Sequence, residues 1–333
     1  MLGIVGSGVK GLSGESGDCS LGVLKMLAGI VVLTVGFGAG PSLVVADHLW
    51  SILKGTIRSG NTRLCTSGTA LLLIKVSENM KHVHIAELNR NGGAVFGGRH
   101  FETPWSVFDY WALEPRDVRK VLGDGAMCEQ GFVYMGGAVE VTAGPFRERS
   151  ESGSGFIIGP VGRECALENI TDRVVGAFHV CVELDEAQMQ EAGRDPIVNV
   201  GAFDRAALKW RDAIHGGSGQ IATRHVLKPE DFRSSWTFLD HAILSAGGSV
   251  GYHYHDALEE SFVVTAGEGL MTIDNETFEV GQGSVTWQGI GQGHGIYNPG
   301  PEELEFVRIA VAQRDEQYTT IDLHDDLSSR GLT

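Results

Sequence analysis

Three histidines and one glutamate in the stretch 247–298 have the types and spacing of a metal-ligand set. His253 and His255 are separated by one residue in an extended run, so their imidazoles point to one side of a strand. Glu260 follows a short turn, and His294 follows a second, Gly-rich turn. Neutral imidazoles and a carboxylate bind divalent first-row metals, and four ligands leave positions open for water or substrate. We therefore predict a metal centre at these four residues.

The same stretch resembles the two-block signature of the cupin superfamily. Block one of that signature, G(X)5HXH(X)3–4E(X)6G, is matched by Gly247, His253, His255, Glu260 and Gly267. Block two, G(X)5PXG(X)2H(X)3N, is matched by Gly283, Gly291, His294 and Asn298, with Gly289 where the family usually has Pro. The register selects Glu260 rather than Glu259 as the ligand.

The resemblance implies an all-β fold of double-stranded β-helix (jelly-roll) barrels and one divalent transition metal, with Fe, Mn, Ni and Zn left open. Cupins also include storage and sensor proteins, so a catalytic metal centre and a binding module are both compatible with the signature. Taken singly, a histidine or glutamate in a strand is more often structural, and Asn298 and the glycines are sufficiently explained by turn geometry.

Residues 80–184 are interpreted as a degenerate copy of the same barrel. Gly136 follows Glu129 at the spacing that separates Gly267 from Glu260, and a PVGRECALEN run ending at Asn169 resembles block two. The residues assigned to the four ligand positions are, in chain order, Leu122, Asp124, Glu129 and Cys165. These side chains are a poor set for a divalent metal, so we expect the first barrel to be structural and Cys165 to lie in a core.

The composition fits a large β protein that does not bind nucleic acid. The chain has 333 residues, of which 42% are hydrophobic, 8% are aromatic and 47 are glycine. This length allows a large core and suggests two domains or one domain with extensions. The formal charge of −16 leaves no basic stripe to displace the counterions of a nucleic acid.

The first 79 residues differ from the rest in charge. They carry six basic and four acidic residues, whereas residues 80–333 carry 20 and 38. Within them, residues 26–46 are free of charge and resemble a signal-peptide core or a marginal membrane span, although Pro41 and four glycines disfavour a stable helix. We interpret residues 1–79 as a leader, a disordered segment or an over-long reading frame, with Met80 as a candidate start, and expect no stable membrane association.

The five cysteines contain no CxxC pair and form no even framework. Those after residue 80 have the character of buried apolar residues in a reducing compartment. The sequence therefore favours a cytoplasmic protein, with secretion or export to the periplasm as the alternative if residues 26–46 act as a signal peptide.

The rest of the chain is divided into three parts. Residues 185–222 form a polar linker with expected helices at 185–192 and 204–214. Residues 223–320 form the metal-binding barrel, and residues 321–333 an exposed acidic tail. Strands are expected in this barrel at 236–244, 251–255, 261–265, 270–273, 283–287, 294–297 and 304–312.

Strand alternation suggests which side chains surround the metal. Gly251 and Ser249 should share the inward face of His253, and Phe262 and Val264 should form an apolar wall beside Glu260. In the preceding strand, His241 is the candidate catalytic proton carrier. Weaker candidates for hydrogen-bonding or carboxylate-anchoring roles are Arg224, His225 and Gln288.

An apolar wall with few charged anchors favours a metal-dependent oxygenase, of the dioxygenase type, that acts on a small organic molecule. A resemblance to two-barrel oxalate decarboxylases implies an Arg three residues before the first ligand histidine, but this position is Val250. A lyase, an isomerase or an amidohydrolase is the alternative enzyme class, and a non-catalytic small-molecule binder or sensor is the alternative to an enzyme. The expected partner is a small molecule, with association into a homodimer also possible.

Overall fold

The computed structural model describes residues 25–27, 30–36, 69–75, 81–88, 93–96, 101–121, 127–190, 197–314 and 316–333. The chain divides into two compact units, Met1–Asn79 and Met80–Thr333. In the first unit an antiparallel sheet has the order β1-β2-β3, and its strands are Lys25–Leu27, Ile30–Gly36 and Thr69–Lys75. Within the described residues no helix is long and apolar enough to cross a membrane.

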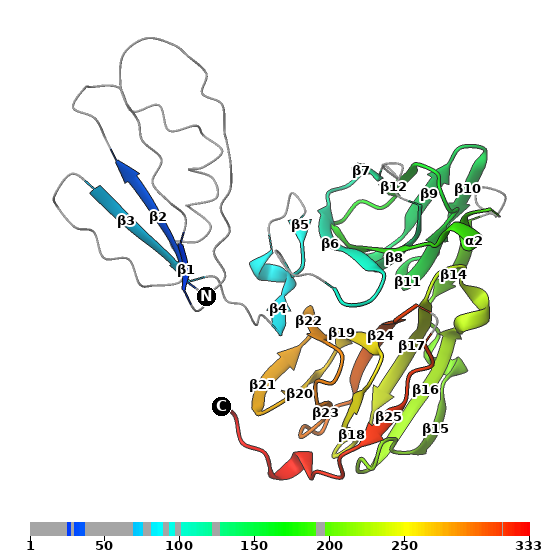
Figure 1. Cartoon of the computed structure of the whole chain (residues 1–333). Helices are drawn as coiled ribbons and strands as arrows, with labels where there is room; N and C mark the ends of the chain where they lie inside the picture. The colour runs from blue at the N-terminus through cyan, green and yellow to red at the C-terminus, as the bar shows by residue number, and fades with distance from the viewer. Residues whose placement is uncertain are drawn as a thin grey trace. The chain divides into compact units, whose positions relative to one another are not determined.

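Part of the second unit is a jelly roll made of a six-stranded and a four-stranded sheet (Figure 1). The order of the larger sheet is β14-β11-β8-β13-β6-β5, and that of the smaller sheet is β10-β9-β12-β7. The strands of this first jelly roll are β5 (Gly93–Ala94), β6 (Trp105–Leu113), β7 (Val118–Val121), β8 (Cys128–Gly137), β9 (Val139–Ala143), β10 (Phe146–Arg149), β11 (Gly153–Gly159), β12 (Cys165–Asn169), β13 (Val175–Glu183) and β14 (Val198–Ala202).

A second jelly roll pairs a seven-stranded sheet, β15-β16-β17-β24-β19-β22-β4, with a five-stranded sheet, β21-β20-β23-β18-β25. Its strands are β4 (His82–His84), β15 (Lys209–Asp212), β16 (Gln220–Leu227), β17 (Trp236–Leu244), β18 (Ser249–His255), β19 (Leu258–Ala266), β20 (Glu268–Ile273), β21 (Glu276–Gly281), β22 (Ser284–Gln288), β23 (His294–Tyr297), β24 (Leu304–Ala312) and β25 (Thr320–Asp322). Short helical turns are η1 (Ile85–Glu87), α2 (Glu186–Met189), η2 (Arg205–Ala207), η3 (Pro229–Asp231) and η4 (Leu327–Ser329). The predicted all-β fold with two jelly rolls is confirmed, although the sheets are open and end in edge strands.

The two jelly rolls exchange strands. β4 precedes the first roll in the chain but pairs with β22 in the second, where Val83 lies opposite Val285. β14 precedes the second roll but pairs with β11 in the first. β14, which leads into the second roll, therefore completes a sheet of the first roll. β4, which leads into the first roll, completes a sheet of the second.

Apolar side chains fill the interior of each roll and the space between the rolls. One buried cluster lies inside the first roll and includes Phe132 and Leu167, and another lies inside the second and includes Phe262 and Phe306. The largest cluster joins residues of both rolls, among them Phe178 of β13 and Val307 of β24. The two large sheets thus pack against each other through their outer faces.

Two buried carboxylates join the rolls reciprocally. Glu129 of the first roll accepts hydrogen bonds from the backbone N–H groups of Arg233 and Ser234, and from the Ser234 hydroxyl at 2.6 Å. Glu259 of the second roll accepts from the N–H groups of Glu102 and Thr103, and from the Thr103 hydroxyl at 2.6 Å. Each carboxylate therefore caps a loop of the opposite roll, and burial raises the pKa of both.

The linker and the tail differ from their predicted structures. The helix expected at 204–214 is wrong, because η2 is a single turn and β15 follows it as an edge strand paired with β16. The apolar residues of this segment have the spacing of a helix, but the pairing of β15 with β16 overrides that local preference. The tail expected to be exposed contributes β25, which pairs with β18, and Leu327, which is buried.

The four motif glycines at 247, 267, 283 and 291 all have positive φ, between 70° and 90°. At Gly267 the approach of the chain is also close, because a Cβ there would lie 2.2 Å from the carbonyl oxygen of Glu303. These positions are therefore fixed by backbone geometry and not by contact with a ligand.

Candidate metal centre

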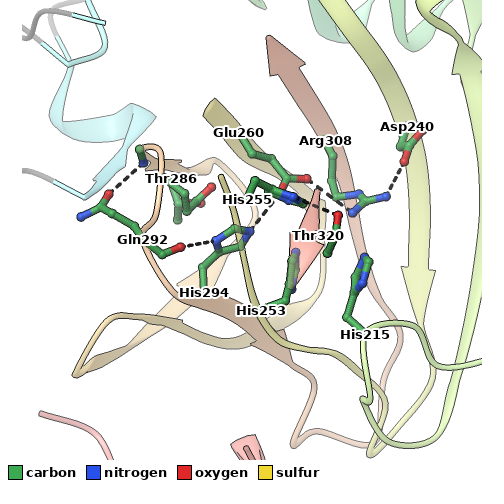
Figure 2. A network of polar contacts seen from close by, with 12 residues as sticks. His215, Asp240, His253, His255, Glu260, Thr286, Gln292, His294, Arg308 and Thr320 are labelled. Carbon is green, nitrogen blue, oxygen red and sulfur yellow. Dashed lines mark hydrogen bonds and ion pairs between the residues drawn. The ribbon is translucent and has the colours of Figure 1, made fainter. Parts of the chain in front are cut away.

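The structure brings His253, His255, Glu260 and His294 together inside the second jelly roll (Figure 2). One ligand atom from each lies within 4.8 Å of the others, and all four residues are buried. His253 and His255 come from β18, and His294 lies opposite His253 on β23. Glu260 reaches the cluster from β19 in the facing sheet. Both sheets of the roll are therefore needed to assemble the set.

A β-bulge sets the direction of the β18 side chains. The pairing of β18 with β23 shifts between Val250 and His253, so the alternation of faces is interrupted there. Val250 packs in the core of the roll beside Ile296, while Ser249 accepts a hydrogen bond from the N–H of Ser218. Ser249, next to the inward-facing Val250, therefore does not share the inward face of His253 as expected, and the bulge means that simple alternation does not fix the face of Gly251. The inward positions expected for Phe262 and Val264 agree with their place in that core.

Each imidazole is oriented through its Nδ1 atom. His253 Nδ1 lies 2.7 Å from the carbonyl oxygen of Gly251, and His294 Nδ1 lies 2.9 Å from that of Gln292. Since a carbonyl oxygen only accepts, both rings donate from Nδ1 and present an unprotonated Nε2 to the cluster. His255 Nδ1 contacts the Thr320 hydroxyl at 3.0 Å. This is the arrangement in which an imidazole binds a metal.

The electrostatics of the four residues also suit a cation. Burial lowers the pKa of His255 and holds that of His253 well below its ordinary value, so both rings are neutral. Burial alone would raise the pKa of Glu260, but the positive charge of the neighbouring Arg308 holds this pKa well below its usual range. His253 Nε2 and Glu260 Oε1 are buried without a hydrogen-bond partner. A divalent ion at this point would satisfy both atoms, so the residues fit a metal.

A buried cation beside the cluster was not foreseen from the sequence. Arg308 of β24 is 6% exposed, and its Nη1 lies 3.4 Å from Glu260 Oε1. Its Nη2 donates to Asp240 of β17, whose other carboxylate oxygen contacts His225 Nδ1. The cross-strand register places Asp240, Arg308 and Phe262 in one row of the inner face. The signal was a charged residue in the middle of the apolar run LEFVRIAVA.

Residues outside the predicted barrel close one side of the cluster. The ring of His215, from the linker, stacks on that of His253 with 4.1 Å between centroids. Its Nδ1 lies 3.2 Å from Asp322 in β25. Gly251 permits this approach, because a Cβ there would lie 1.9 Å from the carbonyl oxygen of His215. The linker and the tail thus contribute to the site.

Other residues singled out in the sequence lie apart from the ligands. His241 faces away from the ligands on β17, because its neighbour Asp240 faces them. Its Nε2 contacts Glu305 at 2.7 Å and its ring stacks on Phe203, so its position does not support a catalytic role. Arg224 lies opposite His241 on β16 and shares its face. Gln288, by contrast, lies opposite Glu260 in the sheet and donates to Thr286.

The first jelly roll contains a position-by-position counterpart of the site. In β8 and β13, Gln130 pairs with Cys181 and Phe132 with His179. In β19 and β24, Glu260 pairs with Ala310 and Phe262 with Arg308. Gln130 and His179 therefore occupy the positions of Glu260 and Arg308. This corrects the interpretation of Glu129 as the counterpart of Glu260, since Glu129 and Glu259 play the same loop-capping role.

No metal-ligand set is found in the described part of the first jelly roll. Cys165, at the position of His294, is fully buried in the apolar core, and burial raises the pKa of its thiol to about 12. Gln130 donates to the carbonyl oxygen of Arg163 and contacts His179 at 3.2 Å. The counterparts proposed for the first two histidines, Leu122 and Asp124, lie outside the described residues.

Two kinds of similarity to known proteins are found: sequence similarity over part of the chain that includes the second jelly roll, and similarity of fold over most of the chain. A family model described as a cupin domain matches residues 241–310. An oxalate-binding protein of Thermotoga maritima is 28% identical over 29% of this chain and 81% of its own length. An uncharacterised protein of Methanocaldococcus jannaschii is 33% identical over 29% of this chain and 78% of its own. The crystal structure of an IolB-like protein from Salmonella typhimurium covers 80% of this chain and 98% of its own, with 15% identity and a TM-score of 0.51.

Proposed function

Since the chain belongs to the cupin superfamily, we propose that it is a metal-dependent lyase acting on a small organic acid at the second jelly roll. The observation that carries this proposal is the buried convergence of His253, His255, Glu260 and His294. The similarity to an oxalate-binding protein supports an organic acid as the ligand. A bound divalent metal, whether Fe, Mn, Ni or Zn, would supply Lewis-acid polarisation of the oxygens of the acid.

The protein's own residues supply the enclosure and the orientation. The carbonyl groups of Gly251 and Gln292 fix the rings of His253 and His294. Phe262 closes the apolar side of the site, which excludes water and strengthens electrostatic contacts within it. In such a site a carboxylate that leaves as CO₂ would be replaced on the remaining carbon by a proton.

The main argument for the oxygenase predicted from the sequence is weakened by the structure. That prediction depended on an apolar pocket with few charged anchors, whereas Arg308 places a guanidinium beside Glu260. The apolar wall of Phe262 and Val264 still suits an oxygenase, which makes this the second candidate. A non-catalytic binder is the third.

One experiment separates the three candidates. The purified protein is analysed for metal, loaded with the ion that it retains, and supplied with small 2-oxo acids and dicarboxylates while CO₂ and dissolved oxygen are followed. A lyase releases CO₂ without consuming an equivalent of oxygen, and an oxygenase consumes oxygen in proportion to product. A metal-loaded protein that binds an acid but converts none of them is a binder.

A further inference from the structure

Arg308 has donor capacity directed into the second jelly roll that the protein itself does not use. Its Nη2 is taken by Asp240 and its Nη1 approaches Glu260, but its Nε is buried with no hydrogen-bond partner. A buried polar atom without a hydrogen-bond partner destabilises the folded protein, and more so when its group is charged. Such an atom beside a candidate metal site indicates a ligand that completes its hydrogen bonding.

The charge balance of the site favours an anionic ligand. Asp240 compensates the charge of Arg308, and its contact with His225 holds the carboxylate in place. The three imidazoles are neutral when they bind a metal, so a divalent ion held by Glu260 alone among charged groups would leave one positive charge. Buried charge is stable only when it is paired, and therefore the remaining charge selects a negatively charged ligand.

We infer that Arg308 is the residue that selects the substrate, by binding a carboxylate of a short acid whose second oxygen donor reaches the metal. This substrate class comprises 2-oxo acids and short dicarboxylates, because guanidinium and ligand cluster lie side by side. The planar guanidinium matches a carboxylate through paired donors. Asp240 is a positioning residue, since it holds one edge of the guanidinium and leaves Nε free. The inference depends on the proposed metal-dependent function of the same site.

A purely structural role for Arg308 predicts a different behaviour. In that case the ion pair with Asp240 would join β17 and β24, and its loss would change stability without changing which ligands bind. Oxalate, oxamate and oxamide have nearly the same shape and carry two, one and no carboxylates. Preference within this series therefore reports recognition of charge and not of size.

The test is calorimetric titration of the protein, loaded with Mn²⁺ or Zn²⁺, with each of these three molecules. The variants are Arg308→Lys, which keeps the charge but loses the planar fork, and Arg308→Gln combined with Asp240→Asn, which avoids an unpaired buried carboxylate. Arg224→Gln is the matched control, because Arg224 lies one strand from Asp240 but on the opposite face. Metal content and thermal unfolding are measured for every variant.

The wild-type protein and the Arg224→Gln control should bind oxalate and oxamate but not oxamide. Both Arg308 variants should bind oxalate about tenfold to a hundredfold more weakly at unchanged metal content, the range of a lost charge-assisted hydrogen bond. Equal binding of oxalate and oxamide, no binding of either, or normal oxalate binding by the double variant overturns the inference. A protein that binds oxalate through Arg308 but converts no acid refutes the proposed lyase and leaves the inference standing.

Discussion

The two jelly rolls keep the same framework and differ in what fills it. Glu129 and Glu259 each cap a loop of the opposite roll. Asn169 donates to the carbonyl oxygens of Leu113, Glu114 and Arg173, and Asn298 donates to those of Leu244, Ser245 and Glu302. Inside the rolls, however, equivalent positions carry different side chains. The first roll has Gln130 and His179 where the second has Glu260 and Arg308. Loop and turn residues therefore maintain the fold, while the interior positions carry the chemistry and can be replaced by packing.

The largest expected difference between the rolls is in metal affinity. Replacing His255 or Glu260 by Ala should remove most of the bound metal, with affinity falling by at least about 100-fold, because each would supply one ligand atom of the proposed site. The matched changes Gln130→Ala and Cys165→Ala should leave metal content unchanged. Elemental analysis after dialysis against a defined free-metal concentration measures this. Loss of metal from the first-roll variants would contradict the assignment of one site.

Because the two rolls share this framework, removal of the loop-capping glutamate of either roll should lower the free energy of unfolding by the same amount. Glu129→Ala and Glu259→Ala should each lower the free energy of unfolding by about 3 kcal/mol, because several donors lose a buried charged acceptor. Urea unfolding followed by fluorescence gives the values, with the exposed Glu148→Ala as control. A neutral effect of either glutamate variant would show that the reciprocal caps are not equivalent.

The stability of the first roll should depend on pH through His179, the counterpart of Arg308. Burial lowers the pKa of its imidazole to about 4, against about 6.5 in an unfolded chain. The unfolded state therefore takes up a proton that the folded state resists, and stability falls as pH drops from about 6.5 towards 4, by about 3 kcal/mol. His179→Gln should remove this part of the pH dependence in urea titrations. The exposed His324→Asn is the control, and identical profiles for wild type and His179→Gln would refute the prediction.

The smallest effect is expected at Cys165. Its thiol is buried and its pKa is raised to about 12, so little thiolate exists at neutral pH. Native protein treated with iodoacetamide should show no modification at this residue by mass spectrometry, whereas protein unfolded in urea should be modified fully. Rapid labelling in the native state would mean that the interior of the first roll is open.

The sequence was sufficient to predict that His253, His255, Glu260 and His294 converge, because the motif spacing determines the register of their strands. The strands at 236–244, 294–297 and 304–312 were predicted with the bounds that the structure has. Alternation within one strand also placed Phe262 and Val264 correctly. These features depend on local geometry, which periodicity reports.

The features that were missed depend on pairing between distant segments. The bulge near Val250 and the equivalence of Gln130 with Glu260 are visible only in the cross-strand register. Arg308 could have been noticed as a charge in an apolar strand, but its partner Asp240 lies on another strand. The role of His215 depends on a linker that folds back against Gly251. No single-segment pattern contains this information.

The strand exchange makes the order of synthesis matter. β14 emerges from the ribosome after its partner β11, so the sheet of the first roll can be completed as the chain grows. β4 emerges before either roll, and its partner β22 is made near the end of the chain. β4 therefore stays unpaired through most of translation, and the seven-stranded sheet can be completed only after β22 has left the ribosome. Chains stalled before Ser284 would therefore carry a free strand edge open to association with other nascent chains.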